Sequence, residues 1–71
     1  MNYYELIIRY DRTTTDCVVF KDERMALSSK GIIDIAIQRE IIDEEMREMI
    51  KDAKSLSVYE YKYIKELLKR K

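Results

Sequence analysis

The first part of the chain alternates between apolar and polar positions. Residues 3–10 show this alternation with tyrosine, leucine and isoleucine at most positions, which predicts a strand that has one buried face. A second short strand is predicted over residues 16–21. Residues 11–15 between them are Asp, Arg and three threonines, whose side chains bond nearby backbone groups and reverse the chain. The pattern therefore predicts an antiparallel hairpin. In its first strand one face is expected to carry Tyr4, Leu6, Ile8 and Tyr10, and the other face Tyr3, Glu5, Ile7 and Arg9.

The pattern over residues 32–42 fits two different structures. Isoleucines at positions 33, 35 and 37 alternate with Asp, Ala and Gln, as in a half-buried strand. A helix through the same residues would be apolar on two nearly opposite sides, and one small core would not cover both of them. We therefore favour a strand over residues 32–38. The helix stays open as the alternative, and it would nearly require a second chain.

Two helices are predicted in the second half of the chain. From about residue 40 the apolar positions follow the helical period, and they predict a helix over residues 40–53 with acidic side chains near its start and lysines near its end. Ser57 followed by Glu60 is the signature of a capping box, which predicts a second helix from there to about residue 70. The expected fold class is α+β: an N-terminal antiparallel β-hairpin, a third strand and two C-terminal helices (ββ-β-α-α). We expect residues 1–71 to form one small domain, because no linker interrupts them.

The composition restricts how so small a domain is held together. Fourteen basic and fourteen acidic side chains give a net charge of zero, so no overall field would draw the chain to nucleic acid or to an anionic membrane. Cys17 is the single cysteine and histidine is absent, which excludes a disulfide within the chain and leaves no ligand set for zinc.

We expect no membrane span and no signal peptide, because the apolar runs are short. With only one cysteine, the cytoplasm is the expected location.

The chain has few residues suited to catalysis. The usual general base at neutral pH is histidine, which is absent. Cys17 lies in an apolar segment without an obvious group to activate its thiol, so we expect it to be a small packing residue. Gly31 is the single glycine, and one glycine makes no phosphate-binding loop. We therefore predict that the protein is not an enzyme and has no catalytic residues, cofactor or metal ion.

The tyrosines indicate where a partner would bind. Tyrosine offers a large, stiff contact surface with a polar tip and is enriched at protein interfaces. Tyr59 and Tyr63 lie one turn apart on the flank of the last predicted helix, and one of the adjacent residues Tyr3 and Tyr4 must face away from the buried side of the sheet. The alternative is that these rings cover the rim of a small core, with their hydroxyl groups in water.

Acidic residues gather in the first predicted helix, where they would meet a basic patch on a partner protein. The alternative is a solvated helix face that stabilises the start of the helix. With three of the tyrosines they make up the predicted partner-binding residues, which are Tyr3, Tyr59, Tyr63, Asp43, Glu44, Glu45 and Glu48.

The order of a strand at 32–38 and helices at 40–53 and 57–70 resembles that of ribbon-helix-helix repressors. In those proteins two chains pair their strands in a ribbon that enters the major groove of DNA. The resemblance implies a dimeric DNA-binding transcriptional regulator, and the lysines near tyrosines at the carboxyl end would suit nucleic acid. The sequence departs from the pattern at Asp34, which would face the phosphate-lined groove. We therefore keep DNA binding as the second hypothesis.

The chain is short, lacks proline and is rich in lysine, isoleucine and tyrosine. In this composition it resembles small phage and mobile-element proteins, anti-CRISPR proteins among them. This resemblance implies a small intracellular protein that inhibits or regulates another protein by covering its surface. The expected partner is thus a protein, nucleic acid is less favoured, and no membrane is involved. Ten isoleucines and four methionines in a chain with little interior also predict a homodimer.

Overall fold

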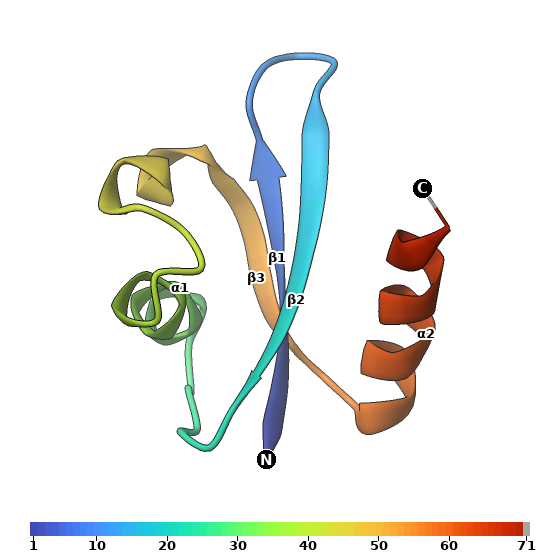
Figure 1. Cartoon of the computed structure of the whole chain (residues 1–71). Coiled ribbons are helices and arrows are strands. Elements are labelled where there is room, and N and C mark those ends of the chain that lie inside the picture. The colour runs from blue at the N-terminus through green and yellow to red at the C-terminus, as the bar shows by residue number, and fades with distance from the viewer. Residues whose placement is uncertain (71) are drawn as a thin grey trace.

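The central element of the fold is a three-stranded antiparallel sheet with a helix on each face (Figure 1). The computed structural model describes residues 1–70, and Lys71, which the single-domain prediction includes, lies outside the described residues. Strand β1 lies between β2 and β3, and Figure 1 shows α1 and η1 on one side of the sheet and α2 on the other. The elements are β1 (Asn2–Arg9), β2 (Thr15–Asp22), α1 (Ser29–Gln38), the short 3-10 helix η1 (Glu44–Met49), β3 (Ile50–Leu56) and α2 (Val58–Lys69).

Strands β1 and β2 form the predicted hairpin. Apolar side chains of the two strands lie side by side on one face, as in the pairs Tyr4 with Phe20 and Leu6 with Val18. Asp11 builds the turn: its Oδ1 accepts hydrogen bonds from the backbone N–H groups of Thr13 and Thr14, both at 2.8 Å. These bonds favour the ionised carboxylate and lower the pKa of Asp11. The local sequence was thus sufficient to predict the hairpin.

The hydrophobic core lies between the sheet and α1. Three side chains of β1 are almost inaccessible to solvent and form its centre: Tyr4, Leu6 and Ile8. The other buried members come from β2, α1, the segment after α1 and β3, and they are Phe20, Ile32, Ile35, Ala36, Ile42 and Ala53. Tyr10 was expected on the same face, but it lies beyond the end of β1 and is exposed. The core therefore depends on segments that are far apart in the sequence.

The strand predicted over residues 32–38 is wrong, because these residues belong to α1. Ser28 caps the start of the helix: its Oγ accepts a hydrogen bond from the backbone N–H of Gly31 at 3.1 Å. The inner side of the helix, which includes Ile32 and Ile35, packs on the sheet. The isoleucines that indicated a strand thus belong to a helix that is apolar around most of its circumference.

The outer side of α1 is partly covered by its own chain. Residues 41–49 fold back beside the helix (Figure 1) and pack with its half-buried isoleucines against the core. Arg47 Nη2 in this segment lies 2.7 Å from Asp34 Oδ1 of α1, and this ion pair joins the segment to the helix. Residues 32–38 thus adopt the helix that the sequence left open as the alternative, and they form no ribbon of the ribbon-helix-helix kind.

The helix predicted over residues 40–53 is also wrong. The helix α1 ends at Gln38, and the residues that follow form a turn, the short η1 and the start of β3. Glu40 adopts a left-handed backbone conformation with φ 59°, and its N–H donates to the carbonyl of Ile37 at 2.9 Å. The N–H of Ile41 donates to the carbonyl of Ala36, also at 2.9 Å. This Schellman arrangement ends a helix. Glycine usually occupies the left-handed position, and its absence here hid the end of the helix from sequence analysis.

The third strand of the sheet is β3 rather than residues 32–38. It pairs antiparallel with β1, as in the pair Leu6 and Ala53, and its register shifts between Ile7 and Ile8. The α+β class is confirmed, with the hairpin, three antiparallel strands and two helices, although the third strand and the first helix lie at other residues than predicted. The third strand follows α1 in the chain instead of preceding it, and the acidic stretch between them forms only η1.

The second predicted helix is confirmed as α2. The Oγ of Ser57 accepts a hydrogen bond from the N–H of Glu60 at 3.1 Å, and Oε1 of Glu60 accepts one from the N–H of Ser57 at 3.0 Å, so the capping box is present. The helix covers the sheet face opposite α1, where the ring centroids of Tyr61 and Tyr3 lie 4.8 Å apart. Within residues 1–70, no helix combines the length and the apolar character needed to cross a membrane.

Replacing Glu40 with glycine is expected to stabilise the protein. A residue with a Cβ is strained in the left-handed conformation and glycine is not, so the free energy of unfolding should rise by about 0.5–1 kcal/mol. Urea unfolding followed by circular dichroism measures this change. Glu45→Gly is the matched control, because Glu45 is an exposed glutamate without a positive φ, and this variant should be less stable than the wild type. A Glu40→Gly variant no more stable than the wild type would contradict the prediction.

Candidate protein-binding surfaces

The outer side of α2 carries a row of large, exposed side chains. Tyr59, Tyr63 and Leu67 are spaced by four residues, which places them on one side of the helix, and we call them the α2 row. Their exposed fractions are 81%, 67% and 44%. Tyr61 lies on the opposite side of the helix and is buried against the sheet. The helix therefore presents one apolar side to the sheet and a second apolar side to its surroundings.

Two members of the α2 row were predicted from the sequence, and the third was not. Tyr59 and Tyr63 were predicted as contact residues, and both are exposed. The helical period also predicts that Leu67 and Leu68 face inward. Leu68 is half-buried, but Leu67 is exposed two turns after Tyr59 on the outer side. The regular spacing of four residues was the signal that would have identified Leu67.

Tyr3 does not belong to the α2 row. It lies on the sheet face that α2 covers, it is half-buried, and its ring packs against that of Tyr61. Lys65 also contacts Tyr61: its Nζ donates to the hydroxyl group at 3.4 Å and lies 5.5 Å from the ring centroid. Tyr3 therefore helps to hold α2 on the sheet and offers a partner only part of its ring.

The predicted acidic contact residues lie far from the α2 row. All four are exposed and belong to η1 or precede it directly: Asp43, Glu44, Glu45 and Glu48. Arg47 Nε binds Oε1 of Glu44 at 2.8 Å, and this hydrogen bond lowers the pKa of Glu44 because it favours the ionised carboxylate. Since η1 lies beside α1 and α2 lies on the other face of the sheet, the structure does not bring the acidic residues and the exposed tyrosines together (Figure 1).

The two outer strands already use backbone groups in contacts with their own chain. In β3 the N–H of Ala53 donates to the Asp52 carboxylate at 3.0 Å, and its carbonyl accepts from the Ser29 hydroxyl group at 2.9 Å. In β2 the carbonyl of Lys21 accepts from Arg39 Nη1. A partner that adds a strand to a sheet edge needs open backbone groups. These contacts would oppose such pairing, so α2 is the better exposed surface.

Cys17 lies beside a buried carboxylate on the sheet face that α2 covers. Its Sγ donates to Oε2 of Glu5 at 3.3 Å, and Nζ of Lys54 lies 3.5 Å from Oε1 of the same glutamate. Among residues 1–70, no three His, Cys, Asp or Glu side chains gather in a way that would hold a metal ion.

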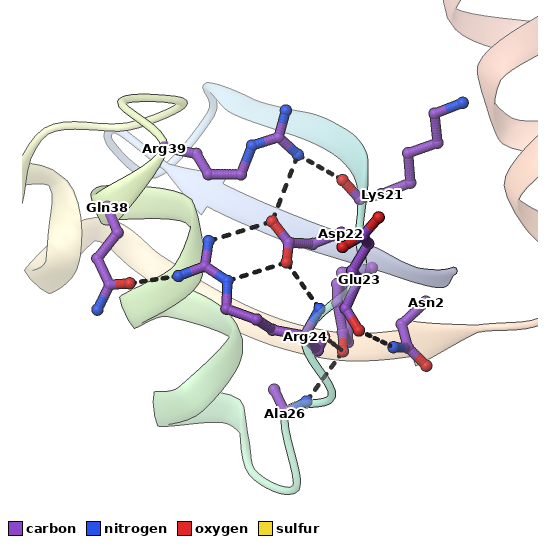
Figure 2. Close-up of polar contacts among 9 residues, drawn as sticks. Asn2, Lys21, Asp22, Glu23, Arg24, Ala26, Gln38 and Arg39 are labelled. Atoms are coloured by element: carbon purple, nitrogen blue, oxygen red, sulfur yellow. Dashed lines mark hydrogen bonds and ion pairs between the residues drawn. The ribbon is translucent and has the colours of Figure 1, made fainter.

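A cluster of polar side chains joins the end of β2 to the end of α1 (Figure 2). The side chain of Asp22 is 10% exposed, and its Oδ1 accepts from the backbone N–H of Arg24 at 2.8 Å and from Nε of the same residue at 2.9 Å. Oδ2 accepts from Arg24 Nη2 at 3.1 Å and lies 3.6 Å from Arg39 Nη1. Arg24 Nη1 also donates to Gln38 Oε1. No sequence pattern predicts this cluster, because only the packing of α1 on the sheet brings Gln38 and Arg39 to Asp22 and Arg24.

Replacing Asp22 with asparagine is expected to lower the free energy of unfolding at neutral pH. It should also make that free energy depend less on pH in the acidic range. Hydrogen bonds from the Arg24 side chain and backbone, together with the charges of Arg24 and Arg39, lower the pKa of Asp22 from 3.8 to about 2. A carboxylate with a depressed folded-state pKa contributes stability above about pH 4, and this contribution is lost as the pH falls toward about 2. Urea unfolding at a series of pH values between 7 and 2, in steps of about one unit, measures this slope.

Asp43→Asn is the matched control for this experiment. Asp43 is exposed and makes no cap hydrogen bond with its side chain. Its variant should keep the wild-type slope of stability in acid, whereas Asp22→Asn should show a smaller slope. Equal slopes in the two variants would show that Asp22 does not carry this pH dependence.

No known protein family, curated protein or solved structure matches this chain. The α2 row lies on one face of the sheet, and the acidic residues around η1 lie on the other (Figure 1).

Proposed function

We propose that this protein binds another protein and inhibits or regulates it by covering part of its surface with the outer side of α2. The main support is the α2 row, because two tyrosines and a leucine lie exposed along successive turns of one helix. A helix that binds in a groove uses anchors with this spacing. Tyrosine is also one of the residues that most often carry the binding energy of an interface.

The charges beside the α2 row indicate what kind of groove it would fit. Complementary charges around an interface steer the correct partner and suppress others. Residues 58–70 carry four basic and two acidic side chains, an excess of two positive charges, and these are Lys62, Lys65, Lys69, Arg70, Glu60 and Glu66. We therefore expect the partner to have an apolar groove with an acidic rim.

Nucleic acid is the less favoured partner. Basic side chains near tyrosines also occur in proteins that bind single strands. Two glutamates accompany the α2 row, however, and residues 32–38 form a helix instead of a DNA-binding ribbon. Binding to DNA would weaken steeply as the salt concentration rises, because counterions are released on binding. Binding through apolar side chains should persist at moderate salt.

The proposed location is the cytoplasm, since a chain with one cysteine suits a reducing compartment. The homodimer also stays a prediction, supported by composition. The structure removes one argument for it, because residues 41–49 partly cover the outer side of α1 within the same chain. Light scattering at high micromolar concentration tests the prediction, and the mass of a single chain would contradict it.

Tyr63→Ala is expected to weaken partner binding about tenfold or more, because truncation of a tyrosine that anchors an interface costs about 2 kcal/mol or more. The partner is first isolated from the native host with the tagged wild-type protein, and calorimetry then measures its affinity for each purified variant. Tyr10→Ala is the matched control, since Tyr10 is an exposed tyrosine of the hairpin and not of α2. It should bind like the wild type. Equal affinities of the two variants would contradict the proposal.

A further inference from the structure

The outer side of α2 has the features of a contact between two copies of this chain. Within residues 1–70, no other element covers the side of α2 that carries the α2 row (Figure 1). The row extends equally far on either side of Tyr63, because Tyr59 precedes it by four residues and Leu67 follows it by four. Such a row can pair with an antiparallel copy of itself, so that Tyr59 of each copy meets Leu67 of the other.

The charges beside the α2 row suit this antiparallel pairing. Lys62 and Glu66 each precede a member of the row by one residue, so both lie on the same flank of the helix. Neither side chain forms an ion pair or a hydrogen bond within residues 1–70, and both residues are exposed. Glu60 lies on the other flank, where its carboxylate accepts a hydrogen bond from the N–H of Ser57. Lys62 and Glu66 are therefore the charged groups available to a second copy on this flank.

A twofold axis at Tyr63 brings opposite charges of the two copies together. It places the flank with Lys62 and Glu66 on the same side of the interface in both copies and reverses the direction of the second helix. Glu66 follows Tyr63 by three residues, and Lys62 precedes it by one. Along the helix axis, Glu66 of one copy therefore lies within about 3 Å of the level of Lys62 of the second copy. Each dimer would contain two such pairs.

We infer that free copies of this protein pair through α2 in an antiparallel, twofold-symmetric dimer, which masks the α2 row until a partner protein displaces the second copy. The masking rests on the proposed function, because the same row would bind the partner. Each copy contributes one helix of 12 residues, about 18 Å long, which buries less area than a stable interface needs. The dissociation constant should therefore be on the order of 100 μM, and a tighter partner would displace the second copy readily.

Charge reversal tests this pairing in the full chain. Lys62→Glu and Glu66→Lys each place like charges opposite each other in both pairs of a dimer, so each variant alone should dimerise more weakly than the wild type. A mixture of the two variants restores two attractive pairs, and the mixed dimer should be about tenfold tighter than the dimer of either variant. Sedimentation velocity at low salt and up to high micromolar concentrations measures these affinities. Lys30→Glu is the matched control, because Lys30 is an exposed lysine of α1, and it should dimerise like the wild type.

Three results would overturn the dimer. The first is a wild-type chain that keeps the mass of one copy at high micromolar concentration, and the second is a mixture that associates no better than each variant alone. The third is association that Glu45→Lys abolishes, because α2 would then bind the acidic residues around η1 of another copy. In all three cases the partner affinities of Tyr63→Ala and Tyr10→Ala still test the proposed function.

The masking has a separate readout. The isolated partner, added in excess to the wild-type dimer, should give a complex that contains one copy of this chain, and light scattering measures its mass. A complex that contains two copies would contradict the masking, because the α2 row cannot contact a second copy and a partner at the same time.

Discussion

Replacing Leu6 with alanine is expected to lower the free energy of unfolding by about 3–4 kcal/mol, the largest effect predicted for this protein. Leu6 is 0% exposed and lies on the central strand, opposite Val18 of β2 and Ala53 of β3. Truncation removes apolar surface from the core and leaves a cavity that the rigid sheet cannot fully close. A domain of this size has a free energy of unfolding on the order of 5 kcal/mol, so the variant should be close to unfolding at room temperature.

Urea unfolding followed by circular dichroism measures this loss. Leu67→Ala is the matched control, because it removes the same atoms from a leucine that is exposed on α2. It should change the free energy of unfolding by less than about 1 kcal/mol. Similar losses in the two variants would show that the face of β1 toward α1 is not the centre of the core.

Tyr4→Phe is expected to cost about 1–3 kcal/mol, although it removes a single oxygen atom. Tyr4 is 1% exposed, and its hydroxyl group donates to the carbonyl of Arg24 at 2.8 Å and accepts from the N–H of Ala26 at 2.9 Å. Without the hydroxyl group, two backbone groups of the loop between β2 and α1 lose their partner. A backbone group that is unsatisfied and shielded from water is destabilising.

The effect of Tyr4→Phe should be visible in two measurements. The free energy of unfolding should fall, and the amide of Ala26 should exchange its hydrogen faster than in the wild type. Tyr10→Phe removes the hydroxyl group of an exposed tyrosine and should change neither quantity. Wild-type exchange at Ala26 in the Tyr4→Phe variant would contradict the role assigned to this hydroxyl group.

The arrangement of the layers separates the surfaces on which partners could bind. The α2 row lies on one face of the sheet, whereas the acidic residues around η1 lie on the other (Figure 1). A single flat partner surface would not contact both, so the tyrosines and the acidic residues should contribute to binding independently. Substitutions in one set are therefore expected to add to those in the other, as for distant sites in general.

Elements with strong local signals were predicted correctly. The hairpin follows from alternation in β1 and from Asp11, whose carboxylate bonds to the next residues of the turn. The start of α2 follows from Ser57 and Glu60, which bind each other within a single turn. The exposure of Tyr59 and Tyr63 follows in turn from the phase of that helix. In each case the interacting groups are close in sequence, so pattern alone was informative.

The middle of the chain was assigned wrongly because its local signals were ambiguous. The isoleucines of residues 32–42 suit a strand or a helix, and the left-handed turn at Glu40 carries no glycine to mark it. What selects the helix is non-local: α1 packs on one face of the sheet, and residues 41–49 return beside it. The intrinsic preferences of these residues are weak beside such packing.

The same distinction applies to the candidate sites. Helical spacing was enough to place two tyrosines on the outer side of α2, a property of one element. The cluster of Asp22, Arg24 and Arg39 exists because β2 and α1 end side by side, and no pattern along the chain encodes that proximity. Short-range periodicity and capping specify single elements, whereas the free energy that joins distant elements comes from burial and hydrogen bonds that arise only when the whole chain is packed.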